Sequence, residues 1–251
     1  SGRDALHYYF SQNYSPPKLD IGVLRMLLEM GCDPNRVNEI QKGRYSRSAI
    51  SVAALNGNKE SLSLLVEYGA DINAKGKQGK SSLHWAVMNQ NEQTTIALIE
   101  LGADVNAQTE KIEMPVHWGL TPLHFGVDKK IVKVLLEHGA KVDLRDDEGN
   151  TPLHTLPHSF YDSEGLALLI KHGADVNAKN NQGDTPLHVA VKANREDIFY
   201  DLLLNGADPY IPDADGMIPA ETKNETFRAI LEGRSVCTNE KKFPGFLKKS
   251  P

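Results

Sequence analysis

Gly69-Ala70-Asp71-Ile72-Asn73 returns 33 residues later as Gly102-Ala103-Asp104-Val105-Asn106, then as Gly173-Ala174-Asp175-Val176-Asn177, with a decayed copy from Gly206. A second phrase keeps step with the first: Thr121-Pro122-Leu123-His124, Thr151-Pro152-Leu153-His154 and Thr185-Pro186-Leu187-His188. A period near 33 residues with a Thr-Pro-Leu-His phrase is typical of a stacked helical array. One repeat cannot bury its own apolar face, so its neighbours must supply the core. The pattern favours a binding surface over a catalytic pocket.

The two phrases resemble the ankyrin repeat family, and the resemblance extends over nearly the whole chain. It implies an all-α solenoid of stacked helix-turn-helix units with hairpin-like finger loops. The local chemistry agrees with this fold. Thr185 stands where an N-cap is needed, and Pro186 stands at the first helical position, where its missing N–H has no cost. Gly206 follows the second helix, as a left-handed terminating residue should.

We divide the chain into an ankyrin repeat domain at residues 1–233 and a C-terminal basic and aromatic extension at residues 234–251. The domain holds seven predicted repeats, of which the first and last are atypical. The repeats open at Asp4, Ser48, Ser81, Thr121, Thr151, Thr185 and Ile218. Second-helix leucines predicted to be buried are Leu64, Leu98, Leu135, Leu169 and Leu203. The extension is a short linear motif, an arm that folds back, or a linker to a downstream region.

Several repeats depart from the period. The segment Asn106–Gly119 is seven residues longer than Asn73–Gly79, and Asn35–Ser46 is also lengthened. Thr121 to Gly139 spans 18 residues where 21 is regular, so the fourth repeat has a short first helix or link. Pro157 must end or bend the first helix of the fifth repeat. Insertions in arrays are loops that often lie on the binding face, although neutral drift produces them too.

Composition excludes several classes of function. The net charge of −5 argues against attraction of the whole surface to nucleic acid or anionic lipid. Cys32 and Cys237 are too far apart to form a disulfide framework, which favours a reducing compartment, the cytoplasm or nucleus. No apolar run approaches the 18 residues of a membrane span.

We predict neither a catalytic residue nor a metal site, cofactor or small-molecule substrate. No phosphate-binding glycine loop is present, and neither Cys nor Ser pairs with a plausible base and orienting group. Five histidines occupy one slot of successive repeats, namely His7, His84, His124, His154 and His188. Stacked helices lie about 8–10 Å apart, so equivalent slots cannot converge on one ion. These histidines are predicted to hydrogen-bond the adjoining turns.

The resemblance also implies where a partner binds. In ankyrin arrays, ligands contact the finger tips and the exposed side of each first helix. The free finger positions are the two residues before the turn glycine and the one after it. On this chain they are Arg44, Tyr45 and Arg47; Lys77, Gln78 and Lys80; His117, Trp118 and Leu120; Asp147, Glu148 and Asn150; Asn181, Gln182 and Asp184; and Ala214, Asp215 and Met217.

Read in order, this row is basic, then aromatic, then acidic. Its positive members are Arg44, Arg47, Lys77 and Lys80, and its negative members are Asp147, Glu148, Asp184 and Asp215. Trp118 stands between them and is a predicted hot spot, because Trp is enriched at interface centres. Chance ordering of polar loop residues is the alternative. Trp85 either faces the groove or packs within the stack.

The sequence therefore predicts a non-catalytic adaptor or recognition domain that binds a partner peptide or domain through the concave face. The alternative is a targeting module of a larger enzyme or secreted effector. Binding to nucleic acid is disfavoured by the acidic later fingers. Three finger asparagines, Asn73, Asn106 and Asn177, follow a leucine by eight residues, and this context resembles the substrate pattern of asparaginyl hydroxylase in the family.

Overall fold

The computed structural model describes residues 5–6, 9, 20–35, 48–76, 79–111, 118–126, 128–156 and 163–232. The chain forms two compact units, unit 1 at Ser1–Lys141 and unit 2 at Val142–Pro251. All regular structure among the described residues is helical. None of the helices described is long and apolar enough to cross a membrane.

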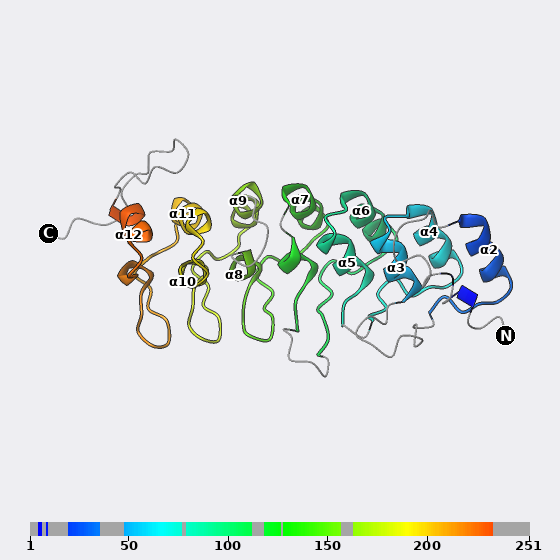
Figure 1. Cartoon of the computed structure of the whole chain (residues 1–251), viewed down its shortest axis with the longest axis horizontal. Coiled ribbons are helices and arrows are strands. Elements are labelled where there is room, and N and C mark those ends of the chain that lie inside the picture. Colours follow the sequence, from blue (N-terminus) through cyan, green and yellow to red (C-terminus); the bar gives the residue numbers. More distant parts are fainter. Residues whose placement is uncertain are drawn as a thin grey trace. The chain divides into compact units, whose positions relative to one another are not determined.

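Unit 1 contains two rows of helices (Figure 1). The first helices of the repeats are α3 (Ala49–Leu55), α5 (Ser82–Met88) and the 3-10 turn η2 (Pro122–Phe125). The second helices are α2 (Ile21–Glu29), α4 (Lys59–Glu67), α6 (Glu92–Glu100) and α7 (Lys129–Glu137). Within each row, every helix packs against the next one along the chain.

Unit 2 repeats this arrangement. Its first helices are α8 (Pro152–Thr155), α10 (Pro186–Lys192) and the 3-10 turn η4 (Pro219–Glu221). Its second helices are α9 (Ser163–Lys171), α11 (Glu196–Leu204) and α12 (Glu225–Glu232). Helix α11 packs against both α9 and α12, and the rings of Phe199 and Phe227 meet edge to face with centroids 4.7 Å apart. The described residues thus supply a second helix for each of the seven predicted repeats.

The predicted helix boundaries are confirmed. Thr185 is the N-cap of α10 in extended conformation, and Pro186 is its first residue. Gly206 follows α11 with φ of +91°, a conformation that residues with a Cβ rarely adopt. The five predicted core leucines are between 0 and 4% exposed.

The irregular repeats also have the predicted form. In the fourth repeat the first helix is reduced to the four-residue turn η2. In the fifth, α8 ends at Thr155, before Pro157. In both repeats the Thr-Pro-Leu-His phrase still forms a capping box at the first turn. The phrase therefore sets where the helix begins, and the residues that follow it set how long the helix is.

Candidate functional site

The fingers are held in place by the histidines of the repeated phrase. In unit 1, the Nε2 atom of His84 lies 3.0 Å from the carbonyl oxygen of Leu120, at the base of the next finger. In unit 2, the Nε2 atoms of His154 and His188 lie 3.0 and 3.1 Å from the carbonyl oxygens of Asp184 and Met217. The predicted hydrogen bonds to adjoining turns are confirmed for these three histidines. His124 bonds Thr121 of its own phrase, and His7 lies outside the described residues.

The partners of His84 define its protonation state. Its Nδ1 atom accepts from the Ser81 N–H at 3.1 Å and is 2.8 Å from the Ser81 hydroxyl. A backbone N–H can only donate and a carbonyl can only accept, so the ring is neutral with its proton on Nε2. Burial lowers the pKa of His84 from 6.5 to about 4. Burial likewise lowers the pKa of His154.

The finger asparagines join one repeat to the next. Asn106 donates to the Gly139 carbonyl at 3.1 Å and accepts from the Lys141 N–H at 2.8 Å. Asn73 accepts from the Asp104 N–H, and Asn177 accepts from the Asp208 N–H, each at 2.8 Å. The structure thus gives all three a role in turn hydrogen bonding. Asn73 and Asn106 also line a polar groove of about 710 Å³.

The long insertion of the fourth repeat is closed at its base. The Thr109 N–H donates to the Leu120 carbonyl and the Gly119 N–H donates to the Thr109 carbonyl, both at 2.9 Å. The Gln108 side chain adds a bond to the Gly119 carbonyl at 2.9 Å. Trp118, next to this base, is 39% exposed. The Lys111 ammonium lies 5.9 Å from the centroid of its ring, within reach of a cation–π interaction.

A second cation–aromatic cluster stands on the first-helix side of unit 1. The Lys80 ammonium lies 5.5 Å from the ring centroid of Trp85 and 5.9 Å from that of Phe125. The Phe125 ring also meets the His84 ring edge to face at 5.9 Å. Trp85 is only 8% exposed, so it contributes mainly packing and leaves Lys80, which is half-buried, at the surface.

The first acidic finger of unit 2 is organised by Asp146. Its carboxylate accepts from the backbone N–H groups of Glu148 and Asn150 at 3.0 and 2.8 Å. The Asn150 amide donates to Asp146 and Glu148, and its oxygen accepts from Asn180 at 2.9 Å. The Asn150 side chain thus hydrogen-bonds both its own finger and the next one. Asp147 and Glu148 are half-buried, whereas Asp215 of the last finger is exposed.

Asp184 differs from the expected exposed finger residue. Its side chain is buried, at 2% exposure, and both carboxylate oxygens accept from the Lys192 ammonium, at 2.6 and 2.7 Å. The sequence pattern failed here because Lys192 comes from the end of α10, eight residues away, and folds over the finger. We therefore leave Asp184 out of the proposed contact surface.

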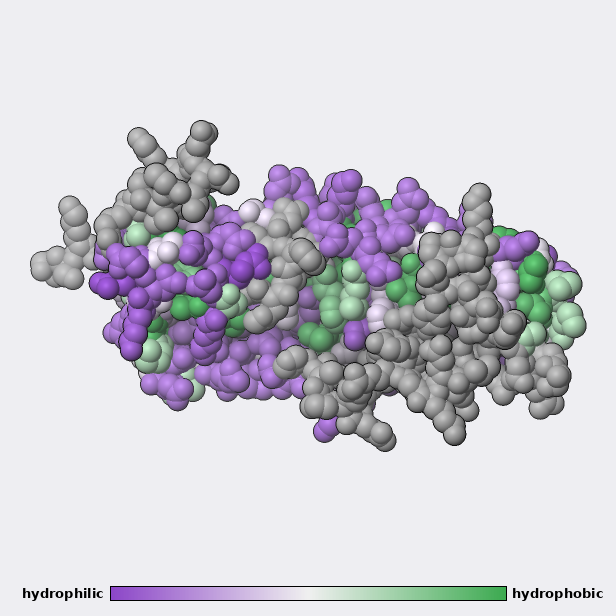
Figure 2. All heavy atoms as spheres, viewed as in Figure 1, coloured by the Kyte–Doolittle hydropathy of each residue, from purple (hydrophilic) through white to green (hydrophobic). Residues whose placement is uncertain are grey.

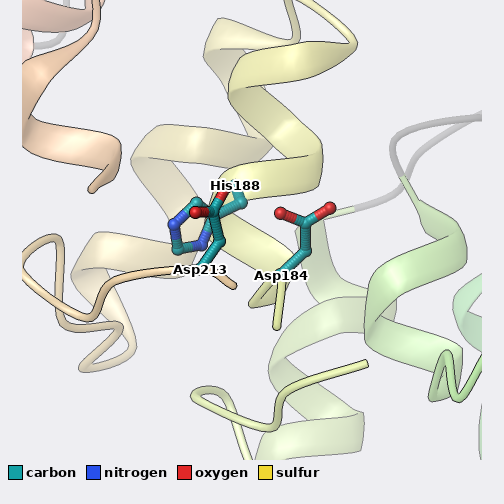
Figure 3. A group of neighbouring side chains, drawn as sticks. All are labelled: Asp184, His188 and Asp213. Atoms are coloured by element: carbon teal, nitrogen blue, oxygen red, sulfur yellow. The ribbon is translucent and has the colours of Figure 1, made fainter. Parts of the chain in front are cut away.

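Asp184, His188 and Asp213 are the group of described residues whose side chains could converge on an ion, with ligand atoms within 4.8 Å of one another (Figure 3). The donors do not fit a metal. The His188 Nδ1 atom accepts from the Thr185 N–H at 3.1 Å and Nε2 donates to Met217, so neither nitrogen has a lone pair to spare. The Lys192 ammonium already neutralises Asp184 and lies 3.9 Å from Asp213.

Six predicted contact residues lie outside the described residues: Arg44, Tyr45, Arg47, Lys77, Gln78 and His117. The structure also brings forward residues that the sequence argument missed. Lys75 pairs with Glu110 of the next finger at 3.1 Å, and the Lys179 ammonium donates to the Pro212 carbonyl at 2.7 Å. Arg145 donates to the Lys179 carbonyl. The sequence pattern that could have identified Lys75, Arg145 and Lys179 is a basic residue four positions before the turn glycine, which recurs in these three fingers.

Comparison with models of protein families matches the model described as ankyrin repeats (3 copies), over residues 19–109 and 123–213. The two matched stretches cover well over half of the chain. A search of curated proteins finds no match. The family match agrees with the paired helices, the capping boxes and the histidine and asparagine bonds between repeats. The chain therefore belongs to the ankyrin repeat family.

Proposed function

We propose that this chain is a non-catalytic recognition domain that binds a peptide or a folded domain of another protein through its fingers and first helices. Ankyrin repeats are generally protein–protein interaction modules. The observation that carries the proposal is the exposed Trp118, fixed beside the hydrogen-bonded base of the longest insertion. A partly exposed Trp beside a hydrogen-bonded turn is the kind of residue that anchors an interface.

The chemistry of unit 1 favours a ligand segment that combines an apolar group with acidic groups. Trp118 offers the apolar contact surface, and the ammonium groups of Lys80 and Lys111 lie close to aromatic rings. Arg44, Arg47 and Lys77 add positive charge from the sequence. A carboxylate that reached these cations would lie close to the same aromatic surface.

The chemistry of unit 2 is the reverse. Its fingers carry Asp147, Glu148 and the exposed Asp215, and Met217 beside Asp215 is 55% exposed. We propose that this unit contacts basic groups of the partner. Unit 1 is thus proposed to contact acidic and apolar groups of the partner, and unit 2 to contact basic groups. Substitutions in each unit can test its contacts separately.

The test of the unit 1 surface measures the kinetics of binding to a captured partner. Lys77→Glu with Lys80→Glu should slow association, with a smaller effect at high salt, because rim charges act mainly by steering. Trp118→Ala should instead speed dissociation and cost about 2 kcal/mol or more, as hot spots do.

Matched controls change the same chemistry on the second helices. Lys59→Glu with Lys133→Glu makes the same change in charge, and Leu204→Ala removes an apolar side chain that is 49% exposed. These variants should bind as the parent does. The proposed surface would be refuted if neither the lysine substitutions nor Trp118→Ala changed the binding kinetics relative to the parent.

We also propose that Asn73, Asn106 and Asn177 are hydroxylated by a separate asparaginyl hydroxylase, which supplies the oxygen atom from dioxygen. Asn73 is exposed, whereas Asn106 and Asn177 are half-buried, so Asn73 should be modified to the greatest extent. Intact-mass measurement of native protein should show added oxygen, and Asn73→Gln should reduce it. Native protein whose mass shows no added oxygen would count against this proposal.

A further inference from the structure

Helix α2 and its C-cap, Met30, carry a stripe of apolar side chains that face solvent. Val23, Met26 and Met30 are 36, 51 and 68% exposed. Their spacing of three and four residues places them on one side of the helix. Leu24, Leu27 and Leu28 of the same helix are buried. Figure 2 shows apolar surface in the region where Figure 1 places α2.

The equivalent positions are covered in the other second helices of unit 1. Met26 stands five residues before the helix-closing Gly31. At the same position, Leu64 in α4, Ala97 in α6 and Val134 in α7 are 3, 9 and 8% exposed. Each of those helices packs on the second helix of the preceding repeat, whereas α2 is the first such helix among the described residues. The stripe is therefore a surface of the type that these repeats cover with a neighbouring helix.

The charges beside the stripe indicate which neighbour fits. Arg25 and Glu29 are exposed and lie one turn apart along one edge of the stripe. When two identical helices pair antiparallel about a twofold axis, the same edge of each helix meets its copy. Arg25 of one chain then faces Glu29 of the other, and the reverse contact forms on the far side of the axis. The edge is thus complementary to itself, as an isologous interface requires.

We propose that α2 pairs antiparallel with α2 of a second copy of this chain, with Met26 near the twofold axis and the Arg25–Glu29 pairs beside it. One helix of nine residues offers a small contact area. The dimer is therefore weak and concentration-dependent, with dissociation in the micromolar range.

The test is sedimentation equilibrium of the whole chain across the micromolar range. The parent should show a monomer–dimer equilibrium. Arg25→Glu alone and Glu29→Arg alone should each be monomeric, because like charges then face each other. An equimolar mixture of the two single variants should restore the dimer, since the glutamate introduced in one chain then faces the arginine introduced in the other. The double variant Arg25→Glu with Glu29→Arg should also dimerise.

Met26→Glu should abolish the dimer, and Lys59→Glu on α4 should leave it unchanged. Circular dichroism of every variant checks that these exposed substitutions keep the fold. A parent that stays monomeric throughout the micromolar range overturns the proposal. A dimer that persists in both single charge variants also overturns it, because association then uses another surface.

Discussion

Leu169→Ala should lower the free energy of unfolding by about 2–5 kcal/mol. Leu169 is 1% exposed on α9, which packs on α11 in unit 2. Removing three carbon atoms there leaves a cavity that the stacked helices can close only in part, so lost transfer energy and lost contacts add together. Denaturant unfolding followed by circular dichroism measures the change.

Leu204→Ala is the matched control, because Leu204 lies on α11 of the same unit but is 49% exposed. It should change the free energy of unfolding by less than about 0.5 kcal/mol, as exposed substitutions usually do. An equally small change for Leu169→Ala would show that the α9–α11 contact contributes little to stability.

Acidification should destabilise the fold through His84. The unfolded chain protonates this imidazole near its ordinary pKa of 6.5, whereas in the folded chain burial lowers the pKa to about 4. Between these values the unfolded state binds more protons than the folded state. The contribution of His84 to the free energy of unfolding is therefore fully present above pH 6.5 and is lost as the pH falls toward 4. One such group contributes a slope of up to about 1.4 kcal/mol per pH unit. His154, whose pKa is also lowered by burial, adds in the same direction.

Unfolding free energies measured between pH 7 and pH 5 test this linkage. His84→Gln should reduce the slope, and it should also destabilise the chain at neutral pH because Ser81 and Leu120 lose their partner. His172→Gln, at the exposed residue that follows α9, controls for the loss of one imidazole. A slope that is the same in His84→Gln and the parent would contradict the assignment.

Most of the fold could be predicted because it depends on local chemistry that recurs. Thr185, Pro186 and Gly206 act within one helix and its turn, so their roles follow from sequence alone. The short η2 and α8 followed from a residue count and from Pro157. The burial of Asp184 could not be predicted, because it depends on Lys192 reaching across from the end of a helix. The roles of Lys75, Arg145 and Lys179 depend on atoms of the next finger, at distances that no local pattern specifies.

The change from basic to acidic fingers coincides with the boundary between the two units. The basic candidates all lie within Ser1–Lys141, and the acidic candidates all lie within Val142–Pro251. A partner with one acidic and one basic segment would therefore contact the two units through different chemistry. Substitutions in one unit should leave the contacts of the other intact, so their effects on affinity are expected to add.

Main-chain atoms of the next repeat are the partners of six recurring side chains: His84, His154, His188, Asn73, Asn106 and Asn177. The histidines bond the carbonyls of Leu120, Asp184 and Met217, two apolar residues and one acidic residue. Asn106 likewise binds the N–H of Lys141, where Asn73 binds that of Asp104. A bond to a carbonyl can therefore form with any residue, and a bond to an N–H excludes only proline. Repeats linked in this way can be duplicated, deleted or exchanged without loss of these hydrogen bonds, while their exposed residues change to bind a new partner.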